Sequence, residues 1–222
     1  MKRHCSQPVA SALVVLGLSL MPHAPIAAQY SQQSLTKRFE SGWENDRLRV
    51  RTISIPPGAQ AQMATDVDRV VIYLTADVEG RMPQAEALWH AAGVGALQNR
   101  GHLRAEAIVV ELKSVQARIA GTPPEALPNS GDVDTRVLID NPRVTVTKHR
   151  YSPHAYAVGP WHFHPEDAVI VYLRGGHTLA PPVGRVRYHV RRGEIDIVPA
   201  NTFHAFANAG SDPLEFLTIF PK

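Results

Sequence analysis

Three histidines in the second half of the chain have the residue type and the spacing of a metal site. His162 and His164 are two residues apart in a segment with strand character, so their rings point to the same side. His204 follows after a further strand and a turn at residues 199–201. Three converging imidazoles suit a divalent transition metal (Fe, Mn, Ni, Cu or Zn) and leave coordination positions for water or substrate. We therefore predict a metal centre at His162, His164 and His204, with a decayed site of packed histidines as the alternative.

Two further side chains are candidates for substrate contact or proton transfer. His149 and Tyr151 precede the histidine pair on another strand that can line the same pocket. The sequence contains no Ser-His-Asp order, glycine-rich phosphate loop or paired catalytic carboxylates, so it gives no support to a hydrolase or a kinase. Cys5 is the only cysteine and lies close to the N-terminus, which leaves His, Asp, Glu and water as metal ligands.

The N-terminus has the pattern of an export signal. Lys2 and Arg3 precede a short apolar run at residues 10–21, and small residues at positions 27 and 28 offer a cleavage site. The run is shorter than the roughly 20 residues that span a bilayer. We therefore expect a signal peptide over residues 1–28, no membrane span after its removal, and a periplasmic or secreted protein. An uncleaved N-terminal anchor is the alternative.

The charge balance excludes one class of partner. Two of the 23 basic residues lie in the leader, and the others nearly balance the 20 acidic residues. The sequence therefore does not indicate a nucleic-acid partner.

Short strand-like segments separated by turn residues make up most of the remaining chain. They lie at residues 48–55, 70–74, 107–112, 144–147, 169–173, 185–190 and 214–220. The segments with most helical character are 83–92 and 112–120, and we expect only the second to form a short helix. The two halves resemble each other: NDRLRV at 45–50 matches NPRVTV at 141–146, and VVIYL at 70–74 matches VIVYL at 169–173. This pattern predicts two similar all-β units, with a single sandwich and a chance similarity as the alternative.

Two segments around the histidines resemble the two sequence motifs of the cupin superfamily. Residues 159–167 (GPWHFHPED) are similar to the first motif. The second motif is matched at Gly193, Pro199, Asn201, His204 and Asn208. The resemblance covers residues 136–222, and an eroded copy covers residues 40–113, with a linker at 114–135. It implies a bicupin: two double-stranded β-helix (jelly-roll) barrels in tandem, with a metal bound by histidines inside the second barrel.

The sequence departs from the cupin pattern at one ligand. Cupins usually supply a glutamate three or four residues after the second histidine of the first motif, where this chain has Ala168 and Val169. A neutral set of three histidines leaves the charge of the metal uncompensated, which favours an anionic ligand or hydroxide. Glu166 is a candidate to replace the missing carboxylate.

The first half has lost more of the pattern. Aligning the two halves places Met63 and Thr65 where His162 and His164 stand, and Gly95 at the position of His204. We therefore expect the first barrel to be filled with apolar side chains and to have a structural role.

Three functions follow from this reading. The first is an exported metal-binding cupin that acts on or binds a small molecule. As an enzyme it would be a metal-dependent dioxygenase or isomerase. The second is a non-catalytic binder of a metabolite or metal, and the third is an envelope structural module with a vestigial site. The resemblance also implies a small-molecule ligand, with anionic character expected, and a homodimer. The fold alone does not choose between these functions.

Overall fold

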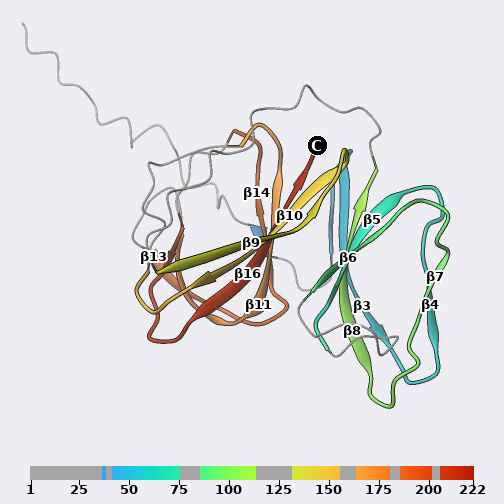
Figure 1. Ribbon diagram of the computed structural model, residues 1–222, viewed down its shortest axis with the longest axis horizontal. Coiled ribbons are helices and arrows are strands. Elements are labelled where there is room, and N and C mark those ends of the chain that lie inside the picture. Colours follow the sequence, from blue (N-terminus) through green and yellow to red (C-terminus); the bar gives the residue numbers. More distant parts are fainter. Residues whose placement is uncertain are drawn as a thin grey trace, which may run out of the picture. The chain divides into compact units, whose positions relative to one another are not determined.

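The computed structural model describes residues 37–38, 42–75, 86–113, 132–155, 164–180, 186–201 and 206–222. Every regular element in these ranges is a β-strand, and the strands form four sheets (Figure 1). The expected all-β fold class is therefore confirmed for this part of the chain. Contacts divide the chain into Met1–Ser31 and Gln32–Lys222, and all described residues belong to the second unit. The predicted signal peptide, residues 1–28, lies outside the described residues. Among the described residues, there is no helix of a length and hydropathy suited to crossing a bilayer.

The first half of the described chain forms a five-stranded and a two-stranded sheet. The larger sheet has the order β2 (Trp43–Glu44), β3 (Leu48–Ile55), β8 (Ala105–Leu112), β5 (Asp68–Tyr73) and β6 (Ala87–His90). The smaller sheet pairs β4 (Gln60–Gln62) with β7 (Ala96–Gln98). All pairs are antiparallel, so alternate residues of each strand face opposite sides of the sheet.

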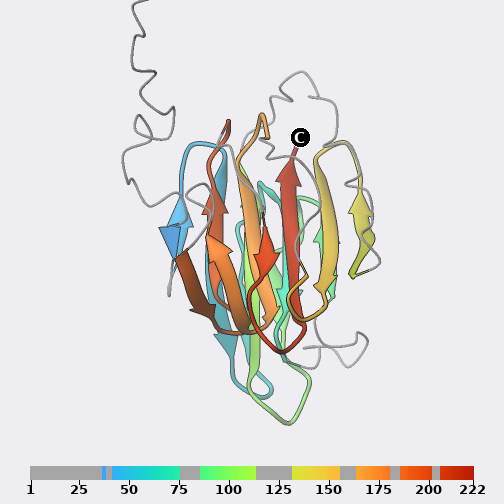
Figure 2. The same cartoon turned by 90° about the vertical axis from the view of Figure 1, so that its left-hand side faces the viewer.

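The second half forms a six-stranded and a three-stranded sheet (Figure 2). The larger sheet has the order β1 (Lys37–Arg38), β14 (Ile195–Val198), β11 (Ala168–Arg174), β16 (Leu214–Pro221), β10 (Val144–Tyr151) and β9 (Val133–Asp140). The smaller sheet has the order β13 (Val186–Val190), β12 (Gly176–Ala180) and β15 (Ala207–Asn208). The strand β1 comes from the start of the chain. Without it, the larger sheet read from its other edge has the order β9-β10-β16-β11-β14, which corresponds strand by strand to β2-β3-β8-β5-β6 of the first half.

An asparagine turn of the same kind precedes strand β3 in the first half and strand β10 in the second half. Asn45 Oδ1 accepts hydrogen bonds from the backbone N–H groups of Arg47 (2.9 Å) and Leu48 (2.8 Å). Asn141 Oδ1 accepts the equivalent bonds from Arg143 (2.8 Å) and from the residue after it (3.0 Å). The match between residues 45–50 and 141–146 therefore corresponds to the same local structure in both halves.

A second asparagine holds a loop closed in each half. Asn99 Nδ2 donates to the carbonyl oxygens of Ile55 and Leu103, both at 2.8 Å. Asn208 Nδ2 donates to the carbonyl oxygens of Tyr151, Ser152 and Asp212. Each side-chain oxygen in turn accepts a bond from the glycine two residues later. Asn208, a motif position in the sequence, therefore satisfies backbone carbonyls that would otherwise lack a donor.

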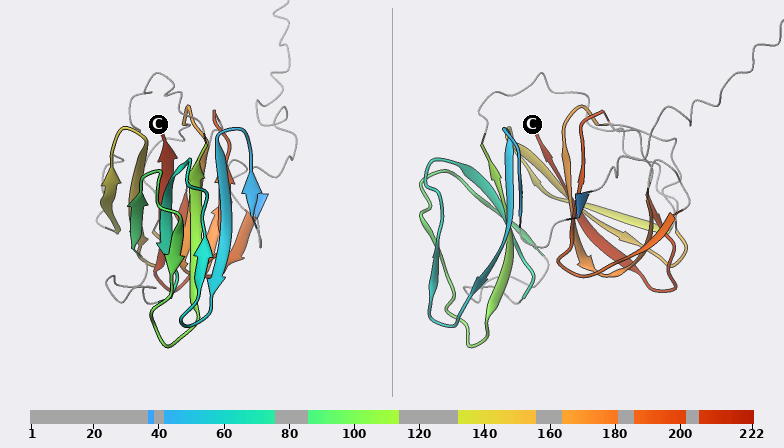
Figure 3. Two further views of the ribbon diagram at one scale, coloured as in Figure 1. Left: turned by 90° about the vertical axis from the view of Figure 1, so that its right-hand side faces the viewer. Right: turned by 180° about the vertical axis from the view of Figure 1, so that it is seen from behind.

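The largest apolar cluster takes buried residues from both large sheets. Figure 3 shows the strands of these sheets in two further views. The first half contributes Leu48, Val50, Val70, Ile72, Leu74, Ala87, Ile108, Val110 and Leu112. The second half contributes Val144, Val146, Val169, Val171, Leu173, Ile195, Ile197, Leu217 and Ile219. Within each strand the listed residues alternate along the sequence. The residues between them therefore point to the other side of the sheet, into the interior of that half. We call this cluster the shared core.

Two ion pairs also join the halves, and each uses the arginine of an asparagine turn. Arg47 pairs with Glu166, which precedes β11. Arg143 Nε lies 2.9 Å from Asp68 Oδ2 at the start of β5. Both pairs are largely buried, which makes them stronger than exposed pairs but costly to break.

One helical candidate of the sequence is a strand in the structure, and the expected helix falls outside the described residues. Residues 87–90, inside the candidate at 83–92 that we did not expect to be helical, form strand β6, which pairs with β5 and places Ala87 in the shared core. The expected helix at 112–120 lies almost entirely outside the described residues, since Leu112 ends β8 and the description stops at residue 113.

Replacing Asn208 should destabilise the fold. Asn208→Ala removes the donor from three carbonyls, of which that of Tyr151 is in a buried hydrogen bond, and we expect the free energy of unfolding to fall by about 1–3 kcal/mol. Urea unfolding followed by circular dichroism measures this change. Ser211→Ala, at an exposed position in the same turn, is the control and should change stability by less than about 0.5 kcal/mol. Equal effects of the two substitutions would contradict the role assigned to Asn208.

The shared core should make the halves unfold together. Leu217→Ala in β16 creates a cavity in the shared core and should cost about 2–5 kcal/mol. Hydrogen exchange followed by mass spectrometry should then show faster exchange in β5 of the first half as well as in β11. Faster exchange in the second half alone would mean that the halves are independently stable.

Candidate functional site

His164 is the one predicted metal ligand that lies among the described residues. It lies four residues before β11 and is 5% exposed, and its ring centroid is 4.7 Å from that of Phe220. Its carbonyl oxygen accepts a hydrogen bond from the backbone N–H of Asn201 at 2.6 Å. Asn201 has a left-handed φ of 59°, as expected for an asparagine in such a turn. This bond joins His164 to Asn201, which lies three residues before His204 in the sequence.

The other two predicted ligands, His162 and His204, lie outside the described residues. Within the described ranges, there is accordingly no cluster of three or more His, Cys, Asp or Glu side chains arranged to hold a metal. The histidine centre therefore stays a prediction.

The first half shows how the corresponding segments are arranged. The backbone N–H of Met63 donates to the carbonyl of Gly95 at 2.9 Å, and Gly93 donates to the carbonyl of Thr65 at 2.8 Å. Met63, Thr65 and Gly95 are the positions that the sequence alignment matches to His162, His164 and His204. Met63 is buried in an apolar cluster with Leu97, as expected for a filled interior.

The two acidic residues after His164 are already engaged. Glu166 pairs with Arg47, so its carboxylate is directed to a guanidinium of the first half. Asp167 accepts hydrogen bonds from Asn45 Nδ2 at 2.7 Å and from the backbone N–H of Ala200 at 2.8 Å. These contacts position the segment before β11 against the first half and against the turn that leads to His204. The sequence alone offered no signal for this link between the halves.

His149 lies on the interior face of β10 as a neutral imidazole. Its Nε2 is 2.9 Å from Thr218 Oγ1, and its Nδ1 is 3.4 Å from Thr135 Oγ1. The ring stacks on Phe216 with centroids 4.9 Å apart. Burial lowers the pKa of His149 to about 4. At neutral pH the imidazole therefore offers one donor and one acceptor rather than a positive charge.

Tyr151 faces the same interior, two residues further along β10. It packs edge-on against Phe206, with centroids 5.7 Å apart, and belongs to an apolar cluster with Tyr172 and Phe216. Burial raises the pKa of Tyr151 to about 12. The phenol therefore stays protonated at neutral pH and is poorly suited to act as a general base.

A buried polar pair lies on the same face and was missed in the sequence. Tyr172 Oη donates to Asp196 Oδ2 at 2.8 Å, and both residues are almost completely buried. The alternation of side chains along β11 could have revealed Tyr172, because it points to the same side of the sheet as Ala168 and Ile170. The interior of the second half thus combines aromatic walls with a few oriented polar groups, as ligand-binding interiors do.

His149 should make the protein sensitive to acid. Its pKa is about 4 in the folded protein and about 6.5 when unfolded, so only the unfolded chain takes up its proton between these values. The contribution is absent above pH 6.5, and stability falls as the pH drops toward 4. Between pH 7.5 and pH 5, His149 should lower the free energy of unfolding of the wild type by about 2 kcal/mol. We expect His149→Asn to lack this part of the decrease.

Urea unfolding at pH 7.5 and pH 5 tests this expectation. His154→Asn is the control, because His154 is exposed and asparagine tolerates its φ of 60°. An unchanged pH dependence in His149→Asn would show that another group causes the acid sensitivity.

Comparison with known proteins places the second half in a family. The family described as "Cupin domain" matches residues 149–220. This range contains β11 to β16, His164 and the interior face described above. No curated protein matches the chain in sequence.

Solved structures share the fold at low sequence identity. A cupin 2 conserved barrel domain protein from Leptotrichia buccalis has a TM-score of 0.56 and 16% identity, over 84% of this chain and 88% of that one. AerE from Microcystis aeruginosa has a TM-score of 0.61 and 8% identity, over 84% and 97%. A salicylate 1,2-dioxygenase from Pseudaminobacter salicylatoxidans has a TM-score of 0.57 and 8% identity, over 81% and 75%. The fold agrees with the sequence motifs, and residues 149–220 of this chain are a domain of the cupin superfamily.

Proposed function

We propose that this protein is an exported cupin that binds a divalent transition metal through His162, His164 and His204 and uses it to bind a small molecule. One observation carries the proposal: the hydrogen bond from Asn201 to the carbonyl of His164. It joins His164, four residues before β11, to Asn201, three residues before His204 in the sequence, which supports a common site for these ligands. The burial of His164 beside Phe220 fits a ligand that is shielded from solvent.

The architecture proposed with it is a bicupin. The first barrel would span residues 40–113, the linker 114–135 and the second barrel 136–222, after a signal peptide at 1–28. The repeated strand order and the repeated asparagine contacts support this division. The apolar interior around Met63 supports a structural role for the first half.

The ligand set favours an anionic small molecule. Three neutral imidazoles do not compensate the charge of a divalent ion, and Glu166 is engaged with Arg47. A bound metal would polarise an anionic group placed in its open coordination positions. The neutral His149, hydrogen-bonded to Thr218, would orient the rest of the molecule against the aromatic wall of Phe216.

Binding is the better supported role, and catalysis is the second candidate. The raised pKa of Tyr151 and the lowered pKa of His149 fit residues that hold a ligand more than residues that exchange protons near pH 7. A similar fold in a salicylate 1,2-dioxygenase keeps oxygenase chemistry as the alternative. Oxygen consumption with the loaded protein and small aromatic carboxylates would decide for catalysis.

Metal content tests the proposed centre. We expect about one transition-metal ion per chain in protein purified from the periplasm without chelator, and a loss of at least tenfold in His162→Ala and His204→Ala. Elemental analysis measures it, and the intact mass shows whether residues 1–28 have been removed.

Glu166→Gln is the matched control. Because Glu166 pairs with Arg47, this variant should keep its metal and lose only stability. Loss of metal in Glu166→Gln would make Glu166 a ligand. A wild-type protein without metal, with no change in stability in the histidine variants, would contradict the centre and favour a structural module.

A further inference from the structure

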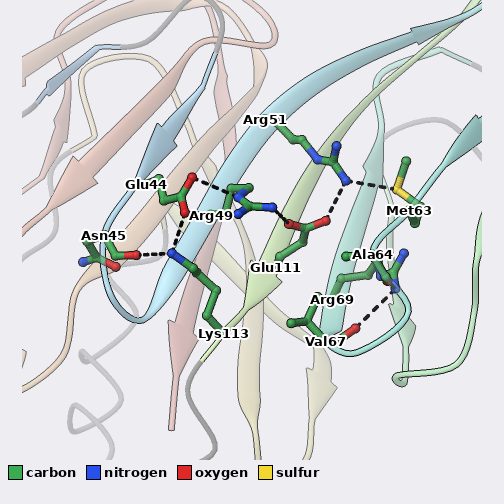
Figure 4. Close-up of polar contacts among 10 residues, drawn as sticks. All are labelled: Glu44, Asn45, Arg49, Arg51, Met63, Ala64, Val67, Arg69, Glu111 and Lys113. Carbon is green, nitrogen blue, oxygen red and sulfur yellow. Dashed lines mark hydrogen bonds and ion pairs between the residues drawn. The ribbon is translucent and has the colours of Figure 1, made fainter.

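A row of charged side chains crosses the interior face of the first half (Figure 4). Arg49, Glu111 and Arg69 are register partners on the neighbouring strands β3, β8 and β5. Arg51 joins the row from the next interior position of β3, with its Nη2 2.6 Å from Glu111 Oε1. Charged groups are rarely buried unless they are paired, so this cluster needs an explanation. We call these four residues the arginine cluster.

Arg69 is buried without enough acceptors. The residue is 0% exposed, and its Nη2 donates to the backbone carbonyls of Ala64 and Val67. Within the described part of the chain, its Nε and Nη1 have no hydrogen-bond partner, and neither does Nε of Arg51. Three guanidinium donors at one place therefore lack acceptors, and each unsatisfied donor destabilises a buried site.

The ion pairs leave one arginine of the cluster without an acidic partner. Arg49 pairs with Glu44, and Arg51 pairs with Glu111. Among the described residues no acid forms an ion pair with Arg69, and Asp68 on the same strand is paired with Arg143. One monovalent anion would neutralise the charge of Arg69.

The cluster is reachable and lies where the first half has lost its metal ligands. The side chains of Arg49 and Arg51 are 40% and 31% exposed, so the cluster opens to solvent on their side. Arg51 Nη2 is 3.6 Å from the sulfur of Met63, which occupies the position aligned with His162. The first half thus presents guanidinium groups at the place where the second half is proposed to present a metal.

We propose that the arginine cluster is a second binding site, which takes the carboxylate group of a small molecule. A carboxylate brings one negative charge and two oxygen acceptors in the planar arrangement that guanidinium groups match. Arg51 and Arg69 would donate to it, while Glu111 holds Arg51 in position and the carbonyls of Ala64 and Val67 hold Arg69. The proposal does not depend on the metal centre, because the two sites lie in different halves.

Calorimetric titration with acetate and propionate at constant ionic strength tests this site, with chloride as the replaced ion. We expect saturable binding in the wild type and at least a tenfold loss of affinity in Arg51→Gln. Arg150→Gln, at an exposed position of the other half with only a 3.7 Å contact to Glu215, should bind like the wild type. Arg49→Gln is a second variant, partly exposed, should Arg51→Gln fail to fold.

The metal variant separates the two sites. Acetate binding that persists in His204→Ala and is lost in Arg51→Gln supports the arginine cluster. Binding that is lost in His204→Ala and kept in Arg51→Gln places the anion at the metal and overturns the proposal. Absence of saturable binding, or binding of inorganic phosphate without binding of carboxylates, overturns it as well.

Discussion

The packing of the two large sheets through the shared core is the constraint on which the rest of the structure depends. Eighteen buried aliphatic residues, drawn from both halves, face one another across this layer. Since one parity of each strand is committed to the shared core, only the other parity is left to form the interior of each half. This division therefore determines which side chains of the described strands face the interior of each half. His149, Tyr151 and Tyr172 can face a ligand because Val146, Val171 and their neighbours face the other sheet.

The side chains that line the interiors of the two halves differ in chemical character. In the second half, aromatic rings surround a few neutral polar groups, and burial keeps His149 and Tyr151 uncharged at neutral pH. In the first half, one end is filled by aliphatic side chains and Met63, whereas the other end concentrates arginines around a single buried carboxylate. The same scaffold thus supports a hydrophobic interior with a proposed metal and an interior with side-chain cations in its place.

Much of the fold could be predicted because alternation and turn residues are local signals. The strands at 48–55, 70–74, 144–147 and 214–220 were found within a few residues, and the matching turns at Asn45 and Asn141 were visible as a repeat. Strand β6 was not predicted because polar and apolar residues alternate only weakly in residues 87–90. Their extended conformation comes with antiparallel pairing to β5. At the site, the segment of His164 was found from its motif. The contacts of Glu166 and Asp167 with Arg47 and Asn45 were not predictable, because they join residues more than a hundred positions apart.

The two ion pairs of the asparagine turns have a further consequence. Arg47 of the first half reaches the residue pair before β11, and Arg143 of the second half reaches the start of β5, so each half gives its partner the same kind of contact that it receives. An interface of this reciprocal kind is what two identical subunits form around a two-fold axis. The two halves of the described chain make contacts of this reciprocal kind with each other. The face of each large sheet that forms the shared core is thereby covered within one chain.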